Sequence, residues 1–177
     1  MKSPGFTIVE LMLVMSISIL MMGWGIIRYV DFNRTQVIKN TGLTIKNNLR
    51  DAEIGAISGN RPLSGCVGNL LGYQVTFAVS SYQIDASCAS GASGNIVTYT
   101  LPQNFIFNSI PSSFTFSVLA QGTSGVNRVI FVRTSGSLGS KTKWYGICVK
   151  TSGDIDDSTS NGCGYTISAS LPTCTCT

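Results

Sequence analysis

A single carboxylate interrupts the long apolar run near the start of the chain. Residues 6–27 carry no charged side chain except that of Glu10. A charge at the centre of a membrane span costs about 2.5 to 3.5 kcal/mol on insertion scales, so such a residue points to a function and to a partner of opposite charge. Cleavage of the chain just before the apolar run would create a suitable amine. The position of Glu10 therefore predicts charge pairing.

Six cysteines are the second group of residues with a chemistry of their own. All of them follow the apolar run: Cys66, Cys88, Cys148, Cys163, Cys174 and Cys176. An even number of cysteines in a translocated domain predicts disulfides. We expect Cys66 to pair with Cys88, because the two flank a plausible hairpin, and for a similar reason we expect Cys148 to pair with Cys163. A bond between Cys174 and Cys176 would close a strained ring, so one or both would fasten the tail elsewhere or stay free.

Metal binding and catalysis find little support in the sequence. The chain has no histidine and no Cys-x-x-Cys pair, which argues against a zinc site. Glu53 is the only glutamate besides Glu10, and no residues form a recognisable triad or a pair of carboxylates for acid–base work. We expect a protein that is not an enzyme, with no catalytic residue and no cofactor.

An acidic cluster near the end of the chain could hold calcium through its oxygen atoms. Its members are Asp154, Asp156 and Asp157. The cluster lacks the ligand spacing and the terminal glutamate of an EF-hand loop. A solvated turn accounts for the same residues, and this is the interpretation that we expect.

Most of the basic residues fall into two groups, and the formal net charge of the chain is +4. One group follows the apolar run, where it would meet lipid headgroups or acidic neighbours: Arg28, Arg34, Lys39, Lys46 and Arg50. The other group lies in predicted strands and would contact DNA if the protein bound it: Arg128, Arg133, Lys141, Lys143 and Lys150. Charges scattered over strands usually only keep a face solvated, so DNA binding is an alternative prediction.

The elements that position these groups begin with a long helix. At 1.5 Å per residue, residues 6–27 would span roughly 33 Å, enough to cross a hydrocarbon core of about 30 Å. Residues 28–60 are more polar but keep an apolar stripe at helical spacing: Val30, Ile38, Ile45, Leu49, Ala52 and Ala56. Gly59 and Pro62 end the pattern. The first half of this helix would be a transmembrane or fibre-core segment, and the second half would pack against a head domain.

Residues 61–177 have the pattern of a β-rich head that contains the cysteines. Alternating apolar and polar residues at 73–77 and 82–86 predict a hairpin. Further strands are predicted at residues 96–101, 105–110, 114–119, 128–133, 144–149 and 165–169. The predicted fold class is α+β, with a long N-terminal helix packed on an antiparallel sheet.

The segment Gly5-Phe6-Thr7-Ile8-Val9-Glu10-Leu11 joins a short basic leader, residues 1–5, to the apolar run. This arrangement resembles the class III signal of type IV prepilins and of type II secretion pseudopilins. The resemblance implies that a membrane peptidase cleaves after Gly5 and that the new N-terminal Phe6 is methylated. It also implies that Glu10 of one subunit meets the amine of Phe6 on its neighbour. Pro4 departs from the pattern, because a lysine commonly precedes the glycine.

The end of the long helix carries a second resemblance. Residues 49–56, followed by Pro62 and Leu63, are similar to the same region of H-type pseudopilins and related minor pilins. Together the resemblances imply a type IV pilin-like fold and a structural subunit of a pilus or pseudopilus. They imply as partners a prepilin peptidase/methyltransferase, an assembly platform, the membrane, and other pilin subunits met through N-terminal helices. The precursor would lie in the cytoplasmic membrane, with its head outside the cytoplasm, before it joins a cell-surface filament.

Two other interpretations stay open at this point. The head could be a pilus-tip binding module for DNA, a surface or a secreted substrate. The apolar run could also be an uncleaved signal anchor of a surface protein, since no small-residue cleavage site follows it as in an ordinary secretory signal. A mature N-terminus at methylated Phe6 would remove the signal-anchor interpretation.

Overall fold

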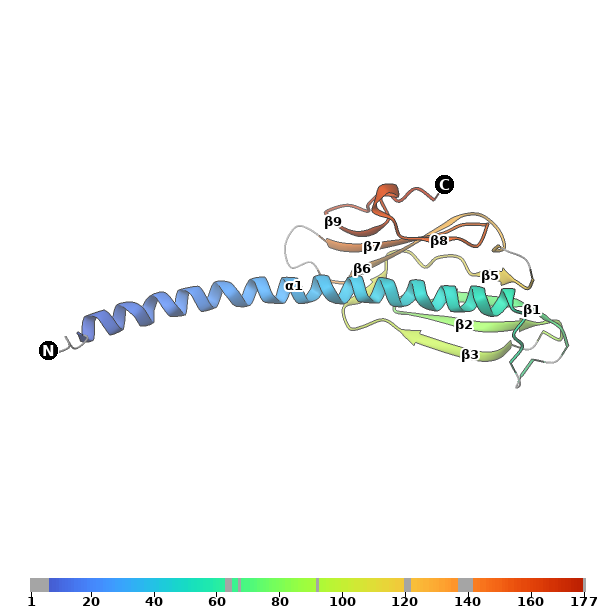
Figure 1. Ribbon diagram of the computed structural model, residues 1–177, viewed down its shortest axis with the longest axis horizontal. Helices are drawn as coiled ribbons and strands as arrows, with labels where there is room; N and C mark the ends of the chain where they lie inside the picture. Colours follow the sequence, from blue (N-terminus) through green and yellow to red (C-terminus); the bar gives the residue numbers. More distant parts are fainter. Residues whose placement is uncertain are drawn as a thin grey trace. The chain divides into compact units, whose positions relative to one another are not determined.

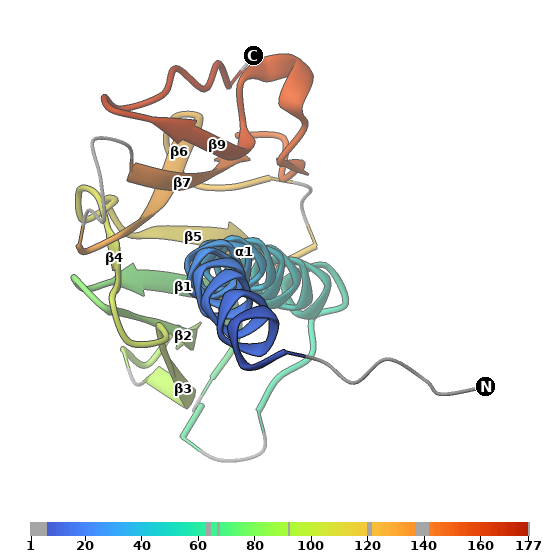
Figure 2. The ribbon, with the colours of Figure 1, turned by 90° about the vertical axis from the view of Figure 1, so that its left-hand side faces the viewer.

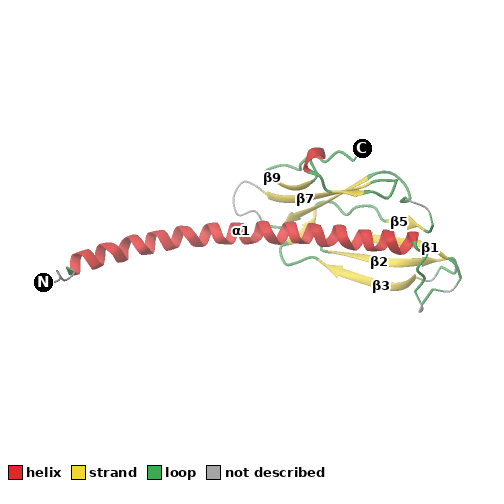
Figure 3. Cartoon of the chain, in the orientation of Figure 1, coloured by secondary structure: helices red, strands yellow, loops and turns green. Residues whose placement is uncertain are grey.

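The computed structural model describes residues 7–62, 65–66, 68–91, 93–119, 122–136 and 142–176. This part of the chain forms a long helix followed by two antiparallel sheets (Figures 1 and 3). The predicted α+β class is confirmed. The chain divides after Val37 into two compact units, so that the helix contributes to both of them.

Helix α1, Ile8–Ile57, is 50 residues long and is capped at each end. At its start the hydroxyl of Thr7 accepts a hydrogen bond of 3.3 Å from the N–H of Glu10, as an N-cap residue does. At its end Gly59 adopts a left-handed conformation with φ of +63°, and the N–H of Asn60 donates to the carbonyl of Gly55 at 3.1 Å. This is the glycine-dependent C-cap that the sequence predicts at Gly59.

The part of α1 that belongs to the second unit, Ile38–Ile57, is called the head half of the helix here, and it buries the predicted apolar stripe. Five of its members are at most 5% exposed: Ile38, Ile45, Leu49, Ala52 and Ala56. Val30, in the other unit, is 43% exposed, so the prediction is wrong for that residue. Gly42 belongs to the buried face because the ring of Tyr145 occupies the space that a Cβ atom at this position would need. The absence of a side chain at Gly42 thus permits close packing of Tyr145 against the helix.

The first sheet has the strand order β3-β2-β1-β5, and every pair in it is antiparallel. Its strands are β1 (Leu70–Phe77), β2 (Ser81–Cys88), β3 (Ser93–Thr100) and β5 (Phe114–Ser117). Val75 of β1 lies opposite Ile84 of β2 and opposite Phe114 of β5, so three buried side chains share one face. The predicted hairpin between β1 and β2 is confirmed.

The second sheet is built around β7, which pairs with β6, β8 and β9, while β4 pairs with β6. Its strands are β4 (Phe105–Phe107), β6 (Arg128–Thr134), β7 (Thr142–Val149), β8 (Ile155–Asp156) and β9 (Gly164–Ser168). The sequence predicted one sheet. The structure has two sheets, because β5 pairs with β1, an earlier strand of the chain, whereas β4 pairs with β6, a later one. Seen nearly along α1, β7 and β9 lie on the opposite side of β5 from β3 (Figure 2).

Aromatic side chains from both sheets form the core of the head. The ring of Phe77 in β1 lies 5.3 Å from that of Phe107 in β4 and 6.1 Å from that of Phe114 in β5. The first of these pairs is nearly perpendicular, a favourable geometry worth about 0.5–1.5 kcal/mol beyond the area buried. The N–H of Phe107 also donates to the carbonyl of Val79 at 2.9 Å. These contacts tie the two sheets into one head.

Candidate assembly site

The first unit presents apolar side chains around the whole circumference of its helix. Between Ile8 and Met22 the large apolar side chains are 47% to 77% exposed, and they occupy almost every consecutive position. Because consecutive residues of a helix point in different directions, no face of this segment is polar. A helix that is apolar all round is typical of a membrane span or of the centre of a bundle. In the part of the chain that the structure describes, α1 is the one helix long and apolar enough to cross a membrane.

The hydroxyl groups in this segment are satisfied by the helix itself. Ser16 donates a hydrogen bond of 2.8 Å to the carbonyl of Met12, and Ser18 donates one of the same length to the carbonyl of Val14. Such bonds to the residue four positions earlier hide the polarity of a serine from an apolar environment. The two hydroxyl groups therefore need no hydrogen-bond acceptor on a neighbouring molecule.

Unlike the two serines, Glu10 carries a polar side-chain group that is not hydrogen-bonded within the described part of the helix. It lies in the first turn of α1, where the helix dipole favours a negative charge by about 0.3–1 kcal/mol. No residue in the described ranges donates a hydrogen bond to its carboxylate or forms an ion pair with it. Gly5 and Phe6, the predicted sites of cleavage and methylation, lie outside the described residues. Within Ile8–Met22, the observed geometry therefore offers one carboxylate that has no partner among the described residues.

The head half of α1 carries a charged contact of a different kind. The ammonium group of Lys46 pairs with Oδ1 of Asp157, while the hydroxyl of Tyr145 donates to Oδ2 at 2.5 Å. Both charged side chains are largely buried, with 15% and 18% exposed. Burial alone would raise the pKa of Asp157, but the hydrogen bonds from Lys46 and Tyr145 outweigh it and hold that pKa below its usual value. The pKa of Tyr145 is raised by burial and by the neighbouring carboxylate.

Replacing Asp157 by asparagine is expected to destabilise the head by roughly 1.5–3 kcal/mol at pH 7, since Lys46 loses its partner. A depressed pKa in the folded state contributes stability above the ordinary value of about 3.9, and this contribution disappears as the pH falls through the folded pKa. The variant should therefore lose less stability between pH 7 and pH 3 than the parent protein. Urea unfolding at the two pH values, followed by tryptophan fluorescence, measures both effects.

The matched control for this prediction is Asp51→Asn, which removes an exposed carboxylate that has no partner in the described part of the chain. Its stability at pH 7 should stay within about 0.5 kcal/mol of the parent. Equal losses of stability at pH 7 in Asp157→Asn and Asp51→Asn would contradict a stabilising role for the Lys46–Asp157 pair.

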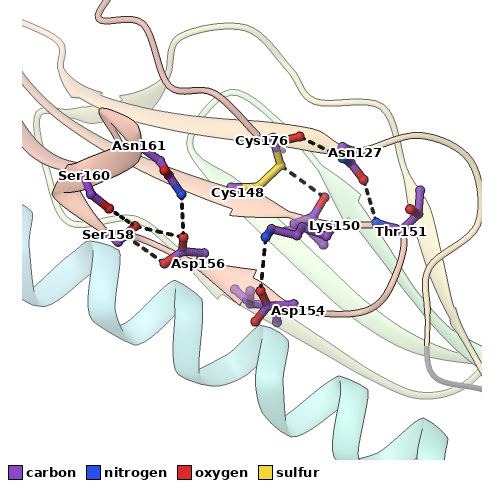
Figure 4. A network of polar contacts seen from close by, with 12 residues as sticks. Asn127, Cys148, Lys150, Thr151, Asp154, Asp156, Ser158, Ser160, Asn161 and Cys176 are labelled. Atoms are coloured by element: carbon purple, nitrogen blue, oxygen red, sulfur yellow. Dashed lines mark hydrogen bonds and ion pairs between the residues drawn. A yellow bond between two sulfur atoms is a disulfide. The ribbon is translucent and has the colours of Figure 1, made fainter.

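The three carboxylates proposed for calcium have separate partners. Asp156 accepts hydrogen bonds of 2.9 Å from the N–H and the hydroxyl of Ser158, and one of 3.0 Å from Asn161, which together lower its pKa (Figure 4). Asp154 forms an ion pair of 3.5 Å with Lys150. Among the described residues, no three His, Cys, Asp or Glu side chains lie close enough to hold a metal ion. Asp156 instead fixes the turn that contains the short 3-10 helix Thr159–Asn161.

The disulfides of the head are Cys66–Cys88, Cys148–Cys176 and Cys163–Cys174. The first is the predicted one, and the predicted bond between Cys148 and Cys163 is wrong. The tail returns over the second sheet, where the N–H of Thr175 donates to the carbonyl of Asn161 at 3.0 Å. The side chain of Asn127 donates to the carbonyl of Cys176 at 2.7 Å (Figure 4). Cys174 and Cys176, although only two residues apart, therefore bond to two separate cysteines.

The basic residues proposed for DNA contact are already engaged in several cases. Arg128 donates to the hydroxyl of Ser112 at 3.0 Å and to the carbonyl of Ser124 at 2.8 Å. Lys150 is paired with Asp154, as noted, and Lys143 is only 8% exposed. Arg133 lies over the ring of Trp144 at 6.0 Å, and Lys141 is outside the described residues. Their contacts thus give no support to a shared phosphate-binding surface.

Comparison with known proteins adds no assignment, because no family model, no curated protein and no solved structure matches the chain.

Proposed function

We propose that the chain is a structural subunit of a type IV pilus or of a type II secretion pseudopilus, in the role of a minor pilin or pseudopilin. The observation that carries this proposal is the segment Ile8–Met22 of α1, which is apolar on all sides and holds one carboxylate, that of Glu10, with no partner among the described residues. The resemblance of residues 5–11 to a class III signal supports the same interpretation.

The subunit is stored in the cytoplasmic membrane as a single-pass precursor. Its span begins near Ile8, and the hydroxyls of Ser16 and Ser18 are bonded within the helix, so lipid leaves neither hydroxyl unsatisfied. Three disulfides in the head favour an oxidising compartment, which supports a location of the head outside the cytoplasm.

Assembly replaces the lipid around this helix by the helices of neighbouring subunits. Cleavage after Gly5 exposes the amine of Phe6, which then pairs with Glu10 of an adjacent subunit. In a bundle of low dielectric, a lone charge is expensive and a paired charge specifies one arrangement, so this pair sets the axial register. The energy for assembly comes from a separate motor acting through an assembly platform, and the prepilin peptidase/methyltransferase supplies the processed N-terminus.

Mass spectrometry of sheared filaments tests the proposal. The expected result is a mature chain that begins at N-methylated Phe6, present at low stoichiometry relative to a major subunit. The variant Gly5→Leu should keep residues 1–5, remain in the membrane fraction and be missing from filaments. A filament-bound chain that retains its first five residues would overturn the proposal and favour the signal-anchor alternative.

A further inference from the structure

The first sheet has an open edge at its outer strand. In the described part of the chain β3 pairs with β2 alone, and every residue of Ile96–Thr100 except the half-buried Tyr99 is exposed. Natural proteins protect such edges with lysine, proline, a bulge or a covering loop. The strand Ser93–Thr100 has no charged residue and no proline. Its register against β2 is irregular between Gly94 and Val97, but the stretch Val97–Thr100 that follows pairs regularly and is rich in β-branched side chains. This stretch is therefore an available template for strand pairing.

A groove of about 190 Å³ lies beside this edge, between the head half of α1 and the helix-facing side of the sheet. Val97 and Tyr99 bring β3 to its wall, and Tyr73 brings β1. The helix contributes Asn48 and Asp51. Because alternate residues of a strand face opposite sides of a sheet, Val97 and Tyr99 mark the face on which the groove opens.

Most of the polar wall of this groove is held in place by contacts within the head. The ring of Tyr99 is stacked on that of Tyr82 at 5.0 Å, and the amide of Asn48 donates to the hydroxyl of Tyr82 at 2.6 Å. The hydroxyl of Tyr73 donates to the carbonyl of Asn60 at 2.8 Å. The rings of Tyr73 and Tyr99, which line the groove, are thus held in place in the free protein. Less conformational entropy is therefore lost when a ligand binds.

The charge of the groove selects the kind of side chain that it would accept. Asp51 is exposed, and its carboxylate has no partner in the ranges that the structure describes. Among the described residues, no lysine or arginine lines the groove. Aromatic rings attract cations through their electron-rich faces, and a carboxylate pairs with them directly. The wall therefore favours an ammonium or guanidinium group over an anion or an apolar group.

We propose that β3 binds an extended peptide by strand addition, with a lysine or arginine side chain of that peptide in the groove beside Asp51. The backbone of the peptide would pair with the open edge at Ile96–Thr100, and every second side chain would lie on the groove side of the sheet. The pairing supplies affinity, and the groove supplies the preference for a basic residue. This inference does not depend on the assignment as a pilin, because it concerns the head alone.

The test uses the full chain in detergent micelles and an octapeptide of alternating threonine and valine with one central lysine. Matched peptides carry norleucine or glutamate in place of the lysine. Titration calorimetry should give at least about tenfold tighter binding for the lysine peptide than for the norleucine peptide. Amide hydrogen exchange at Ile96–Thr100 should slow in the complex, while exchange in β9 should not change.

Three variants separate the groove from a general effect of charge. Asp51→Asn should bring the affinity for the lysine peptide down to that for the norleucine peptide, and Asp51→Lys should reverse the preference in favour of the glutamate peptide. Asp154→Asn removes an exposed carboxylate that does not line the groove and should change neither affinity. Absence of saturable binding at millimolar peptide, binding without protection of β3, or equal effects of Asp51→Asn and Asp154→Asn would overturn the proposal.

Discussion

Replacing Glu10 by glutamine is expected to lower the amount of the subunit in sheared filaments by at least about 100-fold, with the same amount in the membrane. Glutamine keeps the size and polarity of the side chain and removes its charge. In the proposed bundle the amine of Phe6 would then be buried without its partner, which costs about 3–5 kcal/mol, and each 1.4 kcal/mol is a factor of ten. Quantitative immunoblots of the membrane and filament fractions measure the two amounts.

The matched control is Glu53→Gln, the same change at the only other glutamate of the chain. Glu53 lies in the head half of α1, where burial raises its pKa and the nearby Arg50 opposes that shift. The amount of the Glu53→Gln variant in filaments should stay within about twofold of the parent. A substitution outside the core typically changes the free energy of unfolding by less than about 0.5 kcal/mol. Normal incorporation of Glu10→Gln would show that the unpaired carboxylate is not what directs assembly.

Removing the Cys148–Cys176 disulfide is expected to destabilise the head by about 3.5 kcal/mol on the chain-entropy estimate for its separation of 28 residues. That is a large part of the roughly 5–15 kcal/mol that stabilise an ordinary domain. The loss is expected because the bond restricts the unfolded chain and also fastens the returning tail against β7. Urea unfolding of the double variant Cys148→Ala with Cys176→Ala, compared with the parent under non-reducing conditions, gives the difference.

The other tail disulfide provides the control, because it closes a shorter loop. Cys163 and Cys174 are separated by 11 residues, for which the same estimate gives about 2.8 kcal/mol. The variant Cys163→Ala with Cys174→Ala should therefore be the more stable of the two. Peptide mapping that recovered Cys148 bonded to Cys163 in the parent protein would contradict the connectivity on which both values depend.

The secondary structure could be predicted where the chain repeats a clear period. The apolar stripe from Ile38 to Ala56 and the alternation of the β1–β2 hairpin both follow from burial on one face, so pattern and structure agree. Strand β8 has two residues, Ile155–Asp156, and so short a strand shows no period at all. The division into two sheets was also missed, because it depends on which distant strands β4 and β5 pair with.

The candidate sites show the same contrast between local and long-range information. Glu10 was recognisable because one charge in an apolar run is a local signal. The partners of Asp157 could not be recognised in the sequence. Lys46 and Tyr145 lie apart from Asp157 in the chain and contact it only after the head has folded. The connectivity of the tail cysteines likewise depends on where the chain returns after Cys163.

The inward-bonded hydroxyls of Ser16 and Ser18 have a mechanical consequence for a filament built as proposed. With these groups occupied inside their own helix, contacts between neighbouring helices along this stretch depend on shape and dispersion alone. Helices joined in that way can shift along one another under tension without exchanging polar partners. Resistance to stretching would then be concentrated near the start of the helix, and such a fibre should extend reversibly under load.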